Sequence, residues 1–160
     1  MKVLALGGSG GMGRFAVETC MDFENISEVI VADINADAAI AFANSMNGKV
    51  SGIGLDVTDT DALKAQMEKV DVVINTVGPF YKYGPPILQA AIDKSCHYLD
   101  INDDWEPTLE MLTLHEKAEN NSITAILGMG ASPGLTNMLG AAAIQELDEV
   151  DTLYTGWTMD

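Results

Sequence analysis

The sequence has few cysteines and few basic residues. Its two cysteines are Cys20 and Cys96. They lie far apart in apolar segments, so we expect two reduced core thiols and no disulfide or metal site. Eight Lys and Arg residues stand against 24 Asp and Glu residues, which gives a formal net charge of -16. Such an acidic surface repels nucleic acids and anionic lipids, so neither is an expected partner.

Long apolar runs are missing as well. No segment reaches the ~18 consecutive apolar residues of a membrane-spanning helix, and the first residues do not form a signal peptide. We therefore expect a cytoplasmic protein that is not a membrane protein. The 160 residues are 48% hydrophobic and 20% charged, a composition typical of one folded domain rather than a disordered chain. Small molecules and other proteins remain as candidate partners.

Short β-branched runs alternate with helical patterns along the chain. Strands are predicted at 3–6, 28–33, 50–55, 72–77, 97–101 and 123–127, and helices at 14–21, 36–46, 62–69, 86–94, 109–120 and 135–147. This alternation predicts an α/β fold, a doubly wound parallel sheet in three layers of the Rossmann type. A further strand is expected at 150–157, where the sequence begins a new element that its end at Asp160 cuts short.

A glycine-rich loop joins the first predicted strand to the first helix. It comprises Gly8, Ser9, Gly10, Gly11, Met12 and Gly13. The first, third and last of these satisfy the G-x-G-x-x-G pattern, in which glycines permit a tight turn, the approach of a pyrophosphate and close helix packing. Free N–H groups at the helix start would face the anion. The same loop could also be a simple turn.

An acidic residue stands where such a motif requires one. Asp33 ends the second predicted strand, 20 residues after Gly13, where a carboxylate can accept both hydroxyls of an adenosine ribose. Neither Ile34 nor the residues directly after it offer a basic group that could bind a 2′-phosphate. The sequence therefore favours NAD over NADP. Arg14, at the helix start, is the basic residue that opposes this preference.

Other classes with a glycine loop fit less well. In a P-loop, Lys and Ser or Thr would stand where the chain has Arg14 and Phe15, so a P-loop NTPase is excluded. No tyrosine has a lysine four positions later, which argues against short-chain dehydrogenases. A methyltransferase stays open, because its second strand also ends in an acid that holds a ribose.

The fourth and fifth predicted strands supply the other candidates. In a doubly wound sheet the ligand lies above the ends of the first and fourth strands, which points to Thr76, Val77 and Gly78. The loop that follows contains Phe80, Tyr81 and Tyr83, which either pack together or line a pocket. Acidic residues from Asp100 to Asp104 could bind an amine, or could cap a helix and face solvent.

Several ordered segments resemble one family. The runs VINTVGPF (73–80), HYLDI (97–101) and GASPGLTN (130–137) are similar to segments of the saccharopine dehydrogenase-like family, and the resemblance covers essentially the whole chain. It implies an NAD(P)-dependent oxidoreductase that acts at a carbon–nitrogen bond of an amino acid or polyamine. It also implies that residues 1–147 form the dinucleotide-binding domain and that 148–160 lead into an absent substrate-binding and dimerisation domain.

The resemblance also assigns site residues. It implies that adenine lies beside Asp56 and Val57, and that Thr76 to Gly78 contact the nicotinamide half. It suggests Tyr83, Asp100, Asn102 and Ser132 for the substrate, although Ser132 stands where many family members have Asp. The catalytic acid or base is not assigned. The full-length protein is expected to be a homodimer with a small-molecule amine substrate. The alternative is a module that binds NAD(P) and senses its redox state without turnover.

Overall fold

Within the part of the chain that the structure describes, six parallel strands form one sheet in the order β3-β2-β1-β4-β5-β6. The computed structural model describes residues 1–46 and 48–156. The strands are β1 (Lys2–Leu6), β2 (Glu28–Asp33), β3 (Val50–Gly54), β4 (Val72–Asn75), β5 (His97–Asp100) and β6 (Ala125–Ile126). This order, with its reversal between β1 and β4, confirms the predicted Rossmann-like fold.

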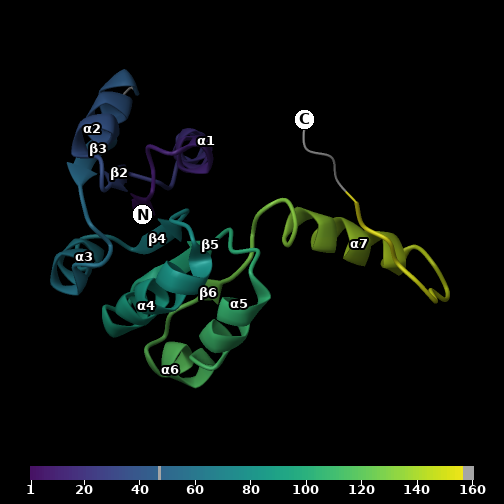
Figure 1. The fold of residues 1–160 in the computed structure, drawn as a ribbon. Helices are drawn as coiled ribbons and strands as arrows, with labels where there is room; N and C mark the ends of the chain where they lie inside the picture. The colour runs from purple at the N-terminus through teal and green to yellow at the C-terminus, as the bar shows by residue number, and fades with distance from the viewer. Residues whose placement is uncertain (47, 157–160) are drawn as a thin grey trace.

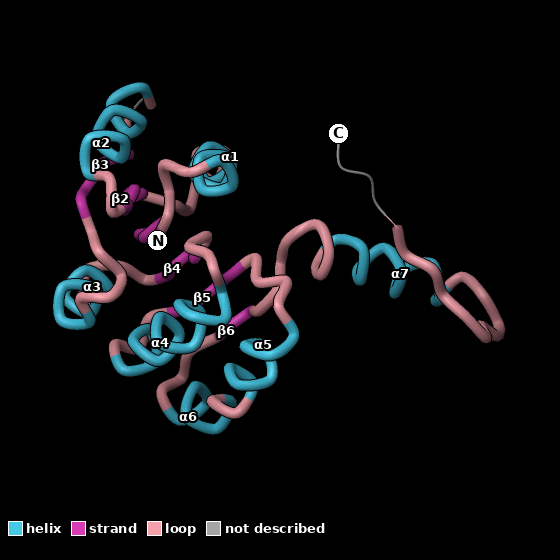
Figure 2. Tube along the Cα trace, viewed as in Figure 1, coloured by secondary structure: helices cyan, strands magenta, loops and turns pink. Residues whose placement is uncertain are grey.

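Helices cover both faces of the sheet. They are α1 (Gly11–Cys20), α2 (Ala36–Ser45), α3 (Thr60–Met67), α4 (Phe80–Asp93), α5 (Trp105–Leu112), α6 (His115–Asn120) and α7 (Leu135–Gln145). Figure 2 shows α1 and α2 on one side of the strands and α3 to α6 on the other. Within the described ranges, no helix is long and apolar enough to cross a membrane.

The alternation of side chains along β1 divides the core into two layers. Val3 and Ala5 pack in the cluster that contains Val17 of α1 and Phe42 of α2. Leu4 and Leu6 point the other way, into the larger cluster with residues from α3, α4 and α5. A strand that is buried on both faces is apolar along its whole length. This is why the sequence shows the central strands as continuous apolar runs.

The chain leaves the sheet after β6. Helix α7 projects away from the sheet and its covering helices (Figure 1). The expected strand at 150–157 is wrong for 150–156, which contain no strand. Instead Leu153 lies against α7, so close that a Cβ added at Gly140 would be 2.7 Å from its Cδ2 atom. Trp157, the last residue of that predicted strand, lies outside the described residues.

Helix α4 begins earlier than predicted. The segment after β4 was expected to be a rigid loop as far as Pro86, yet the helix starts at Phe80 and contains Pro85 and Pro86. Two prolines remove two intrahelical donors. The carbonyls four residues earlier belong to Tyr81 and Lys82, two exposed residues in the first turns of the helix.

Other boundaries differ by smaller amounts. The helix expected at 109–120 is two helices, α5 and α6, separated by a turn at Thr113 and Leu114. Strand β6, at the edge of the sheet, has only two residues and pairs with β5. The side chains of Asn35 and Asp59 accept hydrogen bonds from backbone N–H groups at the starts of α2 and α3 and so cap these helices.

We expect Gly13→Ala to destabilise the fold strongly. A Cβ at Gly13 would lie 2.1 Å from the Gly7 carbonyl oxygen and 2.7 Å from the Gly8 Cα, so α1 would have to move away from the loop. Overpacking of this kind costs about 2 kcal/mol or more. Gly11→Ala is the matched control, because a Cβ there meets nothing within 4 Å. Urea unfolding of both variants measures the difference, and equal stabilities would contradict the packing argument.

A second prediction concerns Asp93, which joins three helices. Its carboxylate lies 2.7 Å from Lys64 of α3 and 2.9 Å from Lys117 of α6, and hydrogen bonds from these lysines lower its pKa to about 2. A lowered folded-state pKa gives stability that is present above pH 4 and lost as the pH falls through about 2.

We therefore expect Asp93→Asn to reduce the free energy of unfolding at pH 7 by about 1 kcal/mol, the scale of partly exposed ion pairs. The difference from wild type should shrink as the pH is lowered from about 4 to about 2. Urea titrations across this range, with Asp22→Asn as a control outside the cluster, measure the effect. A difference that persisted unchanged at pH 2 would show that the ion pairs are not its cause.

Candidate functional site

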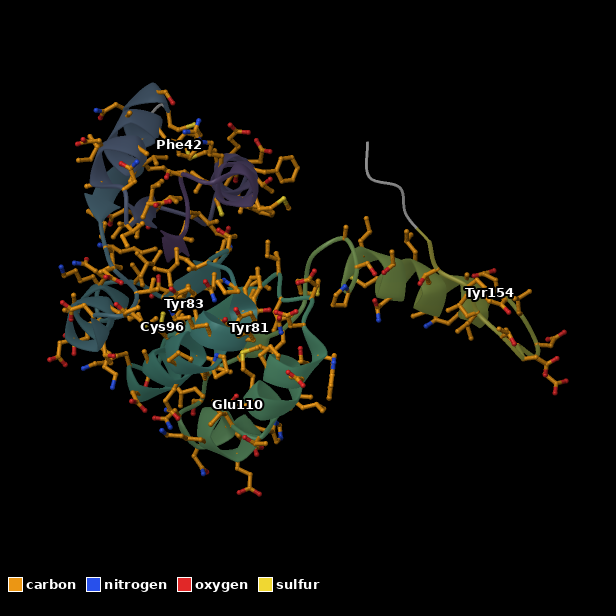
Figure 3. All side chains as sticks on the ribbon, viewed as in Figure 1. Phe42, Tyr81, Tyr83, Cys96, Glu110 and Tyr154 are labelled. Carbon is orange, nitrogen blue, oxygen red and sulfur yellow. The ribbon has the colours of Figure 1, made fainter. Side chains whose placement is uncertain are left out.

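A crevice of about 320 Å³ opens at the carboxyl ends of β1 to β4. Its lining comes from four strand ends and from the start of α4: Gly7, Gly10, Ala32, Asp33, Ile34, Leu55, Asp56, Val57, Thr58, Thr76, Val77, Gly78 and Tyr83. Most of the cofactor residues named from the sequence are in this set. Tyr83 and Tyr81 both belong to the first turns of α4 (Figure 3), but Tyr81 is 67% exposed and does not line the crevice.

The glycine loop presents unpaired backbone donors to the crevice. Gly7 has a φ of +69° and donates its N–H to the Ala32 carbonyl, which turns the chain sharply after β1. Gly10 caps α1 but has no side chain to bond the N–H groups of the first helical turn. Those three donors have no partner within the helix. Together with the helix dipole they form a site for a phosphate or another anion.

Gly8 and Gly13 serve the packing of this loop rather than its lining. A Cβ at Gly8 would lie 2.8 Å from the Ala5 carbonyl oxygen. Gly13 allows α1 to approach β1 so closely that the helix start stands over the strand end. Gly11 and Met12 lie on the exposed side of the first turn, with Met12 56% exposed.

Asp33 stands at the end of β2 beside the loop. The Ser9 hydroxyl donates to its Oδ2 atom at 2.6 Å, and the Asn35 N–H donates to Oδ1 at 3.2 Å. These two bonds fix the plane of the carboxylate. The remaining lone pairs can accept hydrogen bonds from a diol in the crevice.

Asp56 lines the crevice just after β3, the strand next to β2. Its Oδ1 atom accepts from the Thr58 hydroxyl at 2.7 Å and from the Thr58 N–H at 2.9 Å. The hydroxyl bond is the main cause of a lowered pKa for this carboxyl. Asp56 is therefore an ionised acceptor at neutral pH, which suits an amino group or ring N–H better than a phosphate.

The end of β4 forms the opposite wall. The Thr76 hydroxyl donates to the Leu6 carbonyl at 2.8 Å and so holds this wall against β1. The Val77 N–H donates to the Asn75 side chain at 3.0 Å. Gly78 leaves the wall open, since a Cβ there would meet nothing within 4 Å.

Two cations lie at the edge of the crevice in this acidic chain. Arg14 donates its Nε–H to the Ser9 carbonyl at 2.7 Å, and its guanidinium lies 4.9 Å from the centre of the Phe42 ring. Lys82 has its Nζ 4.8 Å from the centre of the Tyr83 ring, and its pKa is raised by Tyr83 and, more weakly, by Asp56. Both can attract an anionic ligand toward the glycine loop.

Three of the four expected substrate residues do not line the crevice. The side chains of Asp100 and Asn102 are fully buried and hydrogen-bonded within the protein. Ser132 is half-buried in the loop between β6 and α7. Of the four substrate candidates, Tyr83 alone lines the crevice. Asp104 begins α5 without a side-chain cap bond.

Sequence reasoning missed four lining residues, Gly7, Ala32, Leu55 and Thr58. Ala32 and Leu55 are apolar strand ends with nothing in the sequence to distinguish them. Gly7 lies just before the motif, at the end of the first strand, where a glycine often allows a sharp turn. Its φ in the structure is positive, as such a turn requires. The Asp56-x-Thr58 spacing is typical of a local side-chain turn and was a usable signal for Thr58.

A larger cavity of about 590 Å³ lies between β6 and the helices α4, α5 and α6. Its lining is mostly apolar and includes Leu88, Ile92, Met111 and Ile123. The glycine turn before α1 and the carboxylates of Asp33 and Asp56 are at the smaller crevice instead. We therefore take the smaller crevice as the functional site.

The crevice has the parts that a dinucleotide needs. A glycine turn with free N–H groups accepts a pyrophosphate, a carboxylate at the end of β2 accepts a ribose diol, and the β1 and β4 ends meet where the strand order reverses. These features occur at one place although they come from residues 7 to 83 of the sequence.

Comparison with known proteins agrees with this geometry. Residues 3–126 match the family model described as "Saccharopine dehydrogenase NADP binding domain". The "Probable mitochondrial saccharopine dehydrogenase-like oxidoreductase" of Arabidopsis thaliana is 26% identical over 92% of this chain and 39% of its own length. The carboxynorspermidine synthase of Vibrio alginolyticus is 30% identical over 66% of this chain and 28% of its own length.

A solved structure gives the same result. Apo saccharopine dehydrogenase (L-Glu forming) from Saccharomyces cerevisiae superimposes with a TM-score of 0.78 and 26% identity, over 91% of this chain and 31% of the yeast chain. The chain thus spans about two fifths or less of the length of these relatives. The family model covers most of the chain, and its family consists of oxidoreductases. The chain therefore belongs to the saccharopine dehydrogenase-like family and contains that family's NAD(P)-binding domain.

Proposed function

We propose that this chain is the nucleotide-binding part of an oxidoreductase that prefers NAD and transfers hydride at a carbon–nitrogen bond of an amino acid or polyamine. The observation that carries the cofactor assignment is the Asp33 carboxylate, fixed by Ser9 beside the uncapped start of α1. When bound, the nicotinamide ring supplies the hydride acceptor or donor.

The dinucleotide would lie along the crevice, with each of its parts beside a different set of lining residues. The pyrophosphate fits the N–H groups from Gly11 to Gly13, and the adenosine ribose fits Asp33. Adenine fits beside Asp56 and Val57, where an ionised carboxylate can accept from an amino group. The nicotinamide half then extends along Thr76 to Gly78 and toward Tyr83.

The preference for NAD rests on charge. A 2′-phosphate would bring its negative charge against Asp33, whereas a ribose diol donates to it. The family model names NADP, so this chain's Asp33 is the feature that argues for the other cofactor. Arg14 is held by the Ser9 carbonyl and the Phe42 ring, which directs its guanidinium along α1 and α2 rather than into the crevice.

The substrate class rests on the relatives. Carboxynorspermidine synthase and saccharopine dehydrogenase are named for amine products or substrates. In this chain the carboxylate and amide of Asp100 and Asn102 are already bonded inside the protein, so we infer that groups outside residues 1–147 bind the amine. That inference is consistent with a second domain after residue 147. The homodimeric state of the full-length protein and its location in the cytoplasm stay predictions from the sequence.

A redox-sensing module is the second candidate, and it fits the same crevice. The relatives reported above are named as an oxidoreductase, a synthase and a dehydrogenase. Those names support catalysis in the full-length protein over sensing.

We expect calorimetric titration to give tighter binding of NADH than of NADPH. Asp33→Ala should weaken NADH binding about tenfold, the cost of roughly 1.4 kcal/mol of ribose hydrogen bonding, and should reduce or abolish the preference. Arg14→Ala is the matched test of the opposing cation and should widen the preference if Arg14 contributes to NADPH binding. Equal or tighter NADPH binding by the wild-type chain would contradict the role given to Asp33.

Gly10→Val should abolish dinucleotide binding while the chain still folds. A Cβ at Gly10 would lie 3.2 Å from the Gly7 carbonyl oxygen, a contact that a small shift can relieve, but the branched side chain would stand where the pyrophosphate approaches. Fluorescence titration with NADH checks the loss, and circular dichroism checks the fold. Thr19→Ala should bind normally, because Thr19 is exposed near the other end of α1, away from the glycine loop. Unchanged binding by Gly10→Val would remove the glycine loop from the site.

We also expect the 160-residue chain to bind cofactor without turning over substrate. An open crevice leaves the nicotinamide wet and the amine unoriented, which removes the proximity and desolvation that hydride transfer needs. The test assays this chain beside the longer protein with NAD and a panel of diamino acids, saccharopine-like conjugates and polyamines. Comparable NADH formation by both would refute the need for a further domain. Inactivity of the longer protein on every amine would favour the sensing alternative.

A further inference from the structure

A chain of buried hydrogen bonds runs from the crevice wall into the middle of the sheet. The Val77 N–H donates to Asn75 Oδ1 at 3.0 Å, and Asn75 Nδ2 donates to the Tyr98 hydroxyl at 2.9 Å. The Tyr98 hydroxyl in turn donates to Asp100 Oδ2 at 2.9 Å. Asn75 and Asp100 are 0% exposed and Tyr98 is 1% exposed.

Asp100 joins this chain to two further loops. Its Oδ1 atom accepts the N–H groups of Asn102 at 3.1 Å and Gly128 at 2.7 Å. Its backbone carbonyl accepts from Met129 at 2.8 Å. The same residue therefore holds the segment after β5 and the segment after β6, from which the chain continues to α7.

The direction of the hydrogen bonds is fixed by the carboxylate. An ionised Asp100 can only accept, so the Tyr98 hydroxyl must donate to it and is left to accept from Asn75. This requires the Asn75 amide nitrogen to face Tyr98 and its oxygen to face the Val77 N–H. A flipped amide would set two donors against each other at Val77 and leave Tyr98 without its donor.

Folding alone does not require these polar groups. Tyr98 packs in an apolar cluster with Leu6, Val73 and Ile87, and Asn75 and Asp100 are buried beside it. Apolar side chains of similar size would pack there without desolvation cost. Burial indeed raises the pKa of both Asp100 and Tyr98. What this arrangement adds is a defined position for the backbone at each of its ends.

We propose that Asn75, Tyr98 and Asp100 are positioning residues that set the Val77 backbone for the nicotinamide half of the cofactor. The inference rests on the proposed function, because it takes the crevice to be the dinucleotide site. The adenosine half, at Asp33 and Asp56, depends on hydrogen bonds to Ser9 and Thr58 that do not involve this network. The three residues should therefore affect one half of the ligand and leave the other unchanged.

The test compares NADH with ADP as ligands for the Tyr98→Phe variant, which keeps the buried ring and removes the link. We expect NADH to bind roughly tenfold more weakly, a loss of about 1.4 kcal/mol, and ADP to bind as in wild type. Amide hydrogen exchange of the Val77 N–H, followed by NMR without ligand, should be at least tenfold faster in the variant.

Cys96→Ala is the control for a general loss of stability. Cys96 is 1% exposed and lies just before β5, at the end of that strand remote from the crevice. It should lower the midpoint of urea unfolding and leave both ligands and the Val77 exchange rate unchanged. Should Tyr98→Phe fail to fold, Asn75→Ala replaces it, since it removes the acceptor of Val77 and preserves the Tyr98 to Asp100 bond.

The outcomes separate the two proposals. Selective loss of NADH affinity together with faster Val77 exchange supports the positioning role. Unchanged NADH affinity, or equal loss of NADH and ADP, would overturn it while leaving the dinucleotide site intact. If the wild-type chain bound neither NADH nor ADP, the proposed function would fail, and the positioning role toward the cofactor would fail with it.

Discussion

The structure depends on how closely the start of α1 approaches the end of β1. Gly13 stands so near the Gly7 carbonyl that a single added carbon would lie 2.1 Å from it. This contact sets the helix directly over the strand end, so that its first N–H groups face the crevice. Asp33 and Thr76 reach the same point because β2 and β4 are the two neighbours of β1 in the sheet.

Charge is distributed unevenly around that point. The chain carries a net charge of -16, yet the crevice must attract a ligand with a negatively charged pyrophosphate. The uncapped helix start, Arg14 and Lys82 supply local positive potential. For the NAD preference proposed above, the acidic surroundings would act in the same direction as Asp33. Binding therefore relies on short-range contacts rather than on the field of the whole protein.

The sequence predicted the fold well because the signals were local and periodic. Continuous apolar strands and the spacing from Gly13 to Asp33 reflect burial on both faces and a fixed βαβ geometry, so β1 to β5 were placed within about two residues. Helix α4 was missed at its start because prolines normally interrupt helices, whereas Pro85 and Pro86 lie inside this one. The strand expected near the end is not formed within residues 150–156, where Leu153 lies against Gly140 of α7.

The candidate site was predicted in part, because some of its signals are also local in the sequence. Residues of the glycine loop and strand ends follow from topology, and the crevice brings them together. Asp100 and Asn102 also follow a strand, but the sequence does not reveal which way their side chains turn. Tyr98, two positions before Asp100 on the same face of β5, supplies an internal partner that draws the carboxylate inward. Such pairing depends on side-chain geometry and is invisible to motif spacing.

Helix α7 has a consequence for the handling of the isolated chain. Its 11 residues include no ionisable side chain, and Leu135, Met138 and Leu139 are each more than half exposed. Copies of the chain are kept apart by mutual repulsion, which acts over about 10 Å at 0.1 M salt and only about 3 Å at 1 M. Added salt removes that repulsion and leaves the attraction between apolar helices. The colloidal stability of this protein should therefore be greatest in dilute buffer, the opposite of proteins that dissolve better as salt is added.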